Sequence, residues 1–319
     1  MYINVSCNAC GASDCRPLAR LQSEVDGNEY QAVRCKQCGL VFAFPISELT
    51  FRELSELYGL DYTESMHALE EDEEDRRALY QATSRQMEMV ESLIPKGRAL
   101  NVGAMGSGSK VLLDRGWELN VVEVSEYAAE TARQEWGMDV TVSRIEDVDY
   151  PAGYFDFIKL GHVIEHLADP GAVLQRLNTF LKEGGLILVD TDNASGLKTR
   201  IEISVRRLLG ERLAAYLVGK LTGKNLHKRY GRLTPPIHLY SFTPGSLKLL
   251  LERTGFTVIK LMEPSWGDLT WFPITCTNDL SLAERAFLLV DRIGARLGHG
   301  EVLVAFARKK AEPRPLDAA

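Results

Sequence analysis

The stretch Arg98-Ala99-Leu100-Asn101-Val102-Gly103-Ala104-Met105-Gly106-Ser107-Gly108 runs from an apolar strand pattern into a glycine-rich turn, and helical spacing follows it. Such a turn lets a ligand approach the backbone beside a helix N-terminus, at the carboxyl edge of a sheet. Glu123 ends the next predicted strand, 20 residues after Gly103. A carboxylate there can accept hydrogen bonds from both hydroxyls of a ribose. We therefore predict a nucleoside-containing cofactor, and nicotinamide dinucleotides and S-adenosylmethionine both use this geometry.

On either side of this stretch, strand and helix patterns alternate. Predicted strands cover 98–104, 118–124, 140–145, 155–160, 186–190, 257–262 and 301–307. Predicted helices cover 76–94, 109–115, 126–136, 172–181, 244–254 and 281–297. Repeated strand–helix units predict an α/β fold with a doubly wound, mostly parallel seven-stranded sheet that helices cover on both faces.

Two cysteine knuckles of the form Cys-x-x-Cys-Gly begin the chain, at Cys7/Cys10 and Cys35/Cys38. Two intervening residues let a tight turn aim both sulfurs at one ion, and the following glycine tolerates the left-handed backbone of that turn. Four thiolates complete a tetrahedral zinc site with no open position for water. We expect this zinc to be structural, so the chemistry must lie elsewhere in the chain.

The organisation along the chain follows from these patterns. We predict a zinc ribbon at 1–47, an acidic linker with a helical segment at 48–75, an α/β domain at 76–310 and a flexible tail at 311–319. A basic helical insertion at 195–235 interrupts the α/β pattern. Between Lys198 and Arg232, ten basic residues face two acidic ones, so this segment carries +8 and the rest of the chain −15.

Composition narrows the class of protein. The chain has 319 residues, 45% of them apolar, and six cysteines, four of which belong to the knuckles. Because Cys15 and Cys276 suggest no disulfide framework, we expect a reducing, cytoplasmic location. The sequence shows neither a signal peptide nor 18 consecutive apolar residues, which predicts no membrane span. A net charge of −7 argues against general nucleic-acid binding.

One further segment narrows the choice of cofactor. It reads Phe155-Asp156-Phe157-Ile158-Lys159-Leu160-Gly161-His162-Val163-Ile164-Glu165-His166-Leu167-Ala168-Asp169-Pro170, and Gly184-Gly185-Leu186-Ile187-Leu188 follows a helix. This pattern resembles the class I S-adenosylmethionine-dependent methyltransferases. It is most similar to the ubiquinone O-methyltransferase-like group, in which Leu/Ile-Glu-His-Leu/Val precedes Asp-Pro. The run His238-Leu239-Tyr240-Ser241-Phe242-Thr243 extends the resemblance. Many such bacterial enzymes carry a similar ribbon.

The resemblance implies a cofactor site and an activity. Asn101 stands where the family has its usual acidic residue and is expected among the cofactor-binding residues, and the glycines are spaced differently from the family's first motif. Gly103 and Gly106, with Ala104 and Gly108 beside them, are expected at the methionine moiety. Glu123 is expected at the ribose, with Val124 beside it in the cofactor site. Ile145, Glu146 and Asp147 are expected at the adenine, and His162 near the transferable methyl. The implied activity is methyl transfer to a small-molecule or glycan acceptor, in polysaccharide or natural-product pathways.

Three histidines are candidates for catalysis: His162, His166 and His238. A hydroxyl acceptor needs a positioned base, and histidine suits neutral pH. His162 and His166 are four residues apart, so with Glu165 they also suggest a metal site. The alternative for His166 is capping or packing of the next helix, and for His238 it is a backbone hydrogen bond in a Pro-rich loop.

The basic insertion has three interpretations: a lid or homodimer helix, a site for an anionic acceptor, or a peripheral membrane anchor at 198–232. Two other functions compete with methyl transfer. Tyr216 and Lys220 match the Tyr-x-x-x-Lys of NAD(P)-dependent short-chain oxidoreductases, but no partner serine stands at the expected offset. A non-catalytic ribbon module that binds nucleic acid or protein is opposed by the balanced charge of the ribbon. The ribbon is instead expected to cover the substrate cleft or to mediate assembly.

Overall fold

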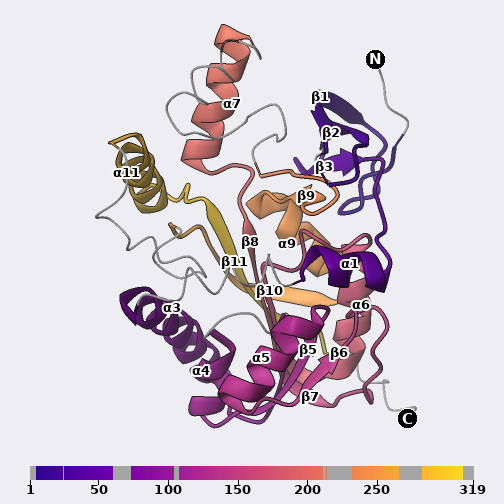
Figure 1. Cartoon of the computed structure of the whole chain (residues 1–319), viewed down its shortest axis with the longest axis vertical. Helices are drawn as coiled ribbons and strands as arrows, with labels where there is room; N and C mark the ends of the chain where they lie inside the picture. The colour runs from indigo at the N-terminus through magenta and orange to yellow at the C-terminus, as the bar shows by residue number, and fades with distance from the viewer. Residues whose placement is uncertain are drawn as a thin grey trace, which may run out of the picture.

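The computed structural model describes residues 5–23, 25–59, 73–103, 108–210, 213, 232–265 and 282–311. Two sheets organise this part of the chain (Figure 1). The predictions made for Ala104, Gly106, Tyr216 and Lys220 lie outside the described residues, as do positions 211–212 and 214–231 of the basic insertion. None of the described helices is long and apolar enough to cross a bilayer.

The larger sheet has seven strands in the order β10-β11-β8-β7-β4-β5-β6. In chain order they are β4 (Arg98–Val102), β5 (Glu118–Glu123), β6 (Val140–Val142), β7 (Phe155–Gly161), β8 (Leu181–Asp192), β10 (Phe256–Met262) and β11 (Val302–Lys309). β4 to β8 pair in parallel, whereas β11 runs antiparallel to both β8 and β10. The prediction of a doubly wound, mostly parallel seven-stranded sheet is therefore confirmed.

Helices cover both faces of this sheet because each presents an apolar stripe to it (Figure 1). On one face lie α3 (Glu73–Glu91), α4 (Gly108–Asp114) and α5 (Glu126–Trp136), and on the other lie α6 (Pro170–Phe180) and α9 (Pro244–Arg253). Three helices begin at a capping residue: α5 at Ser125, α6 at Asp169 and α9 at Thr243. Each capping side chain accepts a hydrogen bond from a backbone N–H in the first turn of its helix. These caps fix where the helices begin. Asp169 rather than His166 caps α6.

The strand order reverses beside β4. The chain leaves β4 for β5 and β6 on one side, then crosses to β7 and β8 on the other. Ligands of open α/β sheets bind outside the carboxyl ends of the strands at such a switch point. Three predicted residues stand there: Gly103 after β4, Glu123 at the end of β5, and His162 after β7.

The smaller sheet contains the ribbon strands β1 (Cys15–Gln22), β2 (Glu29–Cys35) and β3 (Val41–Phe44), all antiparallel. Its fourth strand is β9 (Tyr240–Ser241), which no sequence pattern predicted. After the ribbon, α1 (Phe51–Leu57) begins at Thr50 through a capping box with Glu53. Of the predicted insertion, the described part contains α7 (Leu197–Leu209), which packs against α11 (Leu282–Arg296).

Candidate active site

A cavity of about 320 Å³ opens at the switch point. Ligand sites of small molecules begin at about this size. Its lining includes eight residues that the sequence had singled out: Gly103, Glu123, Val124, Ile145, Glu146, His162, His166 and His238. The cofactor-binding and catalytic predictions, separated by more than 130 residues of chain, thus meet in one space.

The β4–α4 turn forms one wall of the cavity. Gly103 has a φ of +92°, and its N–H donates to Val122 O at 2.8 Å. The side chain of Asn101 is buried behind the turn and does not line the cavity. Its amide donates to Gly103 O at 2.6 Å and to Ser109 Oγ at 2.8 Å. Asn101 therefore braces the turn against α4, and Gly108 stands at the start of that helix.

Glu123 occupies the position expected for a ribose ligand. Its carboxylate is buried and lines the cavity, and Oε1 accepts the backbone N–H of Ser125 at 2.8 Å. That hydrogen bond sets the orientation of the carboxylate at the N-terminus of α5. Ile145 and Glu146 line the same end of the cavity, beyond β6. A buried carboxylate beside an apolar wall fits the ribose and adenine of S-adenosylmethionine.

His162 has an unusual backbone. Its φ is +51°, the one positive φ outside glycine among the described residues. Two hydrogen bonds hold its N–H, to Asp190 O at 3.0 Å and to Asp190 Oδ1 at 2.9 Å. A positive φ in a bulky residue is costly and persists where the surrounding structure enforces it. The bend turns the imidazole back over the chain, so that Nδ1 lies 3.0 Å from Glu165 Oε1.

The pair of His162 and Glu165 is charged at neutral pH. Burial opposes protonation of His162, but the hydrogen bond and charge of Glu165 outweigh it and raise the pKa of His162 to about 9. Burial of Glu165 is likewise outweighed by His162, which lowers the pKa of Glu165 to about 2. The result is a buried imidazolium beside the cavity. In this protonated form the His162 ring is a hydrogen-bond donor to Glu165.

His166 and His238 lie together, with ring centroids 4.7 Å apart. His166 Nδ1 is 3.0 Å from Ile237 O, and His238 Nδ1 is 3.1 Å from Arg232 O. A carbonyl partner assigns a proton to each Nδ1 and leaves each Nε2 with a lone pair. Burial, followed by the nearby His238, lowers the pKa of His166 to about 4. His166 is therefore neutral at physiological pH.

Glu165, His166 and His238 also form a candidate cation site. One ligand atom from each lies within 4.8 Å of the others, and Glu165 Oε2 is buried with no hydrogen-bond partner in the described part of the chain. Two imidazoles and a carboxylate suit zinc and similar divalent ions. The sequence had grouped His162 with Glu165 and His166. In the structure, Nδ1 of His162 is hydrogen-bonded to Glu165, and His238 takes its place in the cluster.

Comparison with known proteins identifies the domain. A family model described as a methyltransferase domain matches residues 73–261, which is more than half of the chain. The chain belongs to this family.

Individual relatives are distant. An uncharacterized protein of Methanocaldococcus jannaschii is 28% identical over 105 residues, which are 33% of this chain and 49% of the relative. This chain thus spans about half the length of the curated relative that it matches. A possible histamine N-methyltransferase of Thermotoga maritima is 20% identical, with a TM-score of 0.45 over 74% of this chain and 91% of that one. A 1,6-didemethyltoxoflavin-N1-methyltransferase of Burkholderia thailandensis, solved with S-adenosylhomocysteine, is 14% identical, with a TM-score of 0.48 over 87% and 97%.

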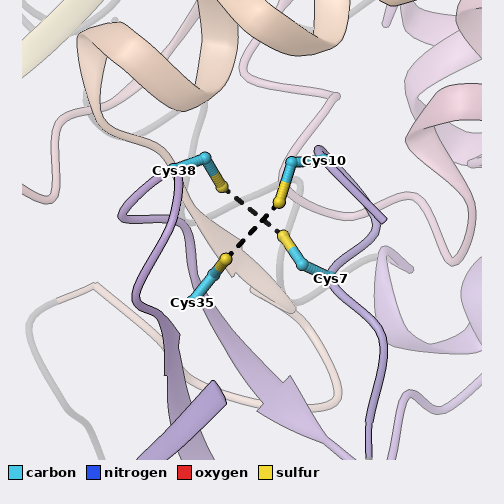
Figure 2. A group of neighbouring side chains, drawn as sticks. All are labelled: Cys7, Cys10, Cys35 and Cys38. Atoms are coloured by element: carbon cyan, nitrogen blue, oxygen red, sulfur yellow. Dashed lines mark hydrogen bonds between the residues drawn. The ribbon is translucent and has the colours of Figure 1, made fainter. Parts of the chain in front are cut away.

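Beside the methyltransferase domain, the four knuckle cysteines converge (Figure 2). Figure 2 shows Cys7 and Cys10 on one loop and Cys35 and Cys38 on another, with their thiols turned toward one another. The Sγ atoms of Cys7 and Cys38 are 3.5 Å apart, as are those of Cys10 and Cys35. Zinc–sulfur bonds of about 2.3 Å in a tetrahedron place sulfurs roughly 3.8 Å apart. The cluster is compatible with one zinc ion.

Cys15 is buried next to this cluster but differs from its members. Burial raises the pKa of Cys15 to about 12, so it stays a thiol. For Cys7, the hydrogen bond with Cys38 lowers the pKa to about 5 despite burial. The pKa values of Cys10 and Cys38 are raised as well, so it is geometry that separates Cys15 from the cluster. The sulfurs of Cys7, Cys10, Cys35 and Cys38 lie within 4.8 Å of one another, and Cys15 is not part of this group.

Sequence reasoning missed several cavity residues. Leu54 and Tyr58 reach the cavity from α1 and the residue after it, a segment for which the sequence predicted a helix but no place at the site. The hydroxyl of Tyr58 lies 3.0 Å from His166 Nδ1. Asp192 and Arg232 line the opposite side, with Asp192 Oδ1 3.6 Å from Arg232 Nε. The amphipathic spacing of α1 was the one signal available for Leu54.

Proposed function

We propose that this chain is an S-adenosylmethionine-dependent methyltransferase of the ubiquinone O-methyltransferase-like group. It methylates a hydroxyl of a small-molecule or glycan acceptor, as in polysaccharide or natural-product biosynthesis, and its ribbon holds one structural zinc. The observation that carries this proposal is the single cavity. Its lining brings together the Gly103 turn, the buried carboxylate of Glu123 and three histidines.

S-adenosylmethionine supplies a methyl group that its sulfonium has already activated, so the protein has to align the acceptor with that methyl. Several residues of the cavity lining contribute to this alignment. Glu123 holds the ribose of the cofactor, and the His162 imidazolium supplies a fixed positive charge in the cavity lining. Tyr58 and Leu54 close the cavity from α1.

The proton of a hydroxyl acceptor must leave as its oxygen attacks the methyl carbon. We assign its removal to Nε2 of His238, because Nδ1 already donates to Arg232 O. The new bond joins oxygen to the methyl carbon, the carbon–sulfur bond breaks, and the proton passes to the imidazole. His166 stays neutral beside it and accommodates the charge that His238 acquires.

Arg232 supports the proposal of an anionic acceptor. Among the described basic residues of the insertion, it is the one that lines the cavity. Its pairing with Asp192 at 3.6 Å still leaves the Arg232 side chain 28% exposed. An acceptor phosphate or carboxylate there would be held by a charge-assisted hydrogen bond. We expect Arg232→Gln to raise the acceptor's KM at low salt and to leave the Kd of S-adenosylmethionine unchanged.

Glu123 provides the test of the cofactor assignment. We expect Glu123→Gln to weaken binding of S-adenosylmethionine by about tenfold to hundredfold, because hydrogen bonds to a charged group contribute roughly 1.5–3 kcal/mol. Isothermal titration calorimetry measures this change. Glu118→Gln is the matched control, since Glu118 lies on the same strand and forms an exposed ion pair with Arg98. Tight binding of NAD or NADP without binding of S-adenosylmethionine would instead support the oxidoreductase alternative.

A further inference from the structure

The ribbon shares a sheet with the segment that carries His238. β9 follows this histidine after one residue and pairs with β3 through Phe42↔Tyr240 and Val41↔Ser241. The backbone N–H of Ala43 donates to Leu239 O at 2.9 Å. The ribbon is therefore joined to the methyltransferase domain by backbone hydrogen bonds and not by a tether alone.

Both cysteine knuckles also contact this segment or the helix after it. The amide of Asn8, inside the first knuckle, donates to the hydroxyl of Tyr240 at 2.6 Å. Arg253 at the end of α9 donates to Cys10 O at 2.5 Å. In the second knuckle, Cys38 O accepts the hydroxyl of Thr243 at 3.2 Å. An ion that fixes the two knuckles relative to each other therefore also fixes the knuckle atoms to which residues 240–253 are hydrogen-bonded.

Tyr240 continues this connection to the catalytic turn. Its hydroxyl donates to Ala168 O at 2.9 Å while it accepts from Asn8. The backbone N–H groups of Leu239 and Tyr240 donate to Glu165 O at 2.9 and 3.2 Å. These three hydrogen bonds hold His238 opposite the turn that carries Glu165 and His166. The ring of Tyr240 is fully buried between the two parts.

The ribbon has no direct place at the reaction. None of the described residues among positions 5–47 lines the main cavity, and Ser47 is the one of them that lines the smaller pocket beside Tyr58 and His166. Its influence on the site has to pass through the segment that follows His238. We propose that metal binding by the four cysteines positions the His166–His238 pair, with Tyr240 as the positioning residue that links the two sites.

The catalytic meaning of this inference rests on the proposed function, but its test does not. The experiment uses the full-length, zinc-loaded protein and two variants, Tyr240→Phe and Tyr30→Phe. Tyr240→Phe keeps the buried ring and removes the hydrogen bonds to Asn8 and Ala168. Tyr30→Phe is the control: it removes a ribbon hydroxyl that donates to Asp26 Oδ2 at 2.6 Å, away from β9.

The first measurement is the NMR spectrum of the histidine Cε1–H groups, assigned with His166→Gln and His238→Gln. We expect Tyr240→Phe to retain one zinc ion and to bind S-adenosylhomocysteine within threefold of the unmodified protein. The signals of His166 and His238 should shift, and kcat for an acceptor should fall about tenfold to hundredfold through misalignment. Tyr30→Phe should leave these signals unchanged.

A second measurement replaces zinc by cadmium, a larger ion that keeps the four thiolates bound. The same two histidine signals should move, whereas the affinity for S-adenosylhomocysteine should not. Histidine signals that are insensitive to both Tyr240→Phe and the change of metal would overturn the inference. Equal shifts in the two tyrosine variants would overturn it as well. Failure to bind S-adenosylhomocysteine would contradict the proposed function and leave these readouts valid.

Discussion

Replacing Cys35 by Ser will abolish zinc binding and destabilise far more of the protein than the ribbon. Cys35 is fully buried, and its thiol lies 3.5 Å from that of Cys10. Binding of a structural zinc supplies on the order of 10 kcal/mol, and loss of one of four ligands removes most of it. We expect zinc content measured by elemental analysis to fall from one ion per chain to near zero.

The destabilisation should spread because the ribbon and the methyltransferase domain share one core. The buried cluster that contains Cys7, Cys10 and Cys35 also contains Leu167, Leu239 and Tyr240. We therefore expect thermal unfolding of Cys35→Ser to begin at a lower temperature for the whole molecule, without a surviving transition of the unmodified α/β domain. Differential scanning calorimetry separates these outcomes.

Cys15→Ser is the control for this experiment. Cys15 is equally buried in the same core, and burial keeps its thiol protonated. Its replacement should retain one zinc ion and lose only the packing contribution of a buried sulfur. If Cys35→Ser kept its zinc and its unfolding temperature, the four-cysteine site would be refuted.

The architecture was predictable because its signals are local. Apolar strands such as 98–102 and helices such as Pro170–Phe180 each have a period that a short window of sequence contains. The predicted helices 126–136, 172–181 and 244–254 agree with the observed α5, α6 and α9 to within two residues. The Cys-x-x-Cys spacing of each knuckle is also a local signal. The four cysteines converge in the structure, as the repeated knuckle predicted.

Contacts between segments that lie far apart in the sequence could not be predicted from local patterns. β9 has two residues and pairs with a strand about 200 residues earlier, so it has no periodicity of its own. The contact between Glu165 and the His162 ring depends on the positive φ of His162. The sequence contains no signal for that backbone conformation. Asn101 seemed a cofactor ligand because it replaces an acidic residue. In the structure its amide instead satisfies a carbonyl and a hydroxyl behind the turn.

His238→Gln should lower kcat for a hydroxyl acceptor by about 10²- to 10⁴-fold, the usual contribution of a general base. Glutamine keeps a polar side chain near Arg232 O, which accepts from Nδ1 of His238, and cannot take up a proton. The Kd of S-adenosylmethionine should stay within threefold, because Glu123 and the Gly103 turn, which we expect to hold the cofactor, are unchanged in this variant. Steady-state kinetics and calorimetry on the same preparation measure the two quantities.

The pH profile tests the role of His162 in the same reaction. Its folded pKa of about 9 lies above the ordinary value of 6.5. The stabilisation from its charge is therefore complete below pH 6.5 and disappears as pH rises through 9. We expect kcat to decline above pH 9 in the native enzyme. His162→Gln should lose this decline together with part of its activity.

The alternative role of His238, as a metal ligand, predicts a different result. If Glu165, His166 and His238 bind a catalytic cation, His238→Gln should lower the affinity for added Mn²⁺, an ion that prefers oxygen and imidazole donors to four thiolates. Electron paramagnetic resonance counts bound Mn²⁺ without interference from zinc in the ribbon. A base role requires activity without Mn²⁺ or any second equivalent of zinc. Dependence on such an ion, lost in His238→Gln, would replace the base with a metal that lowers the pKa of the acceptor hydroxyl.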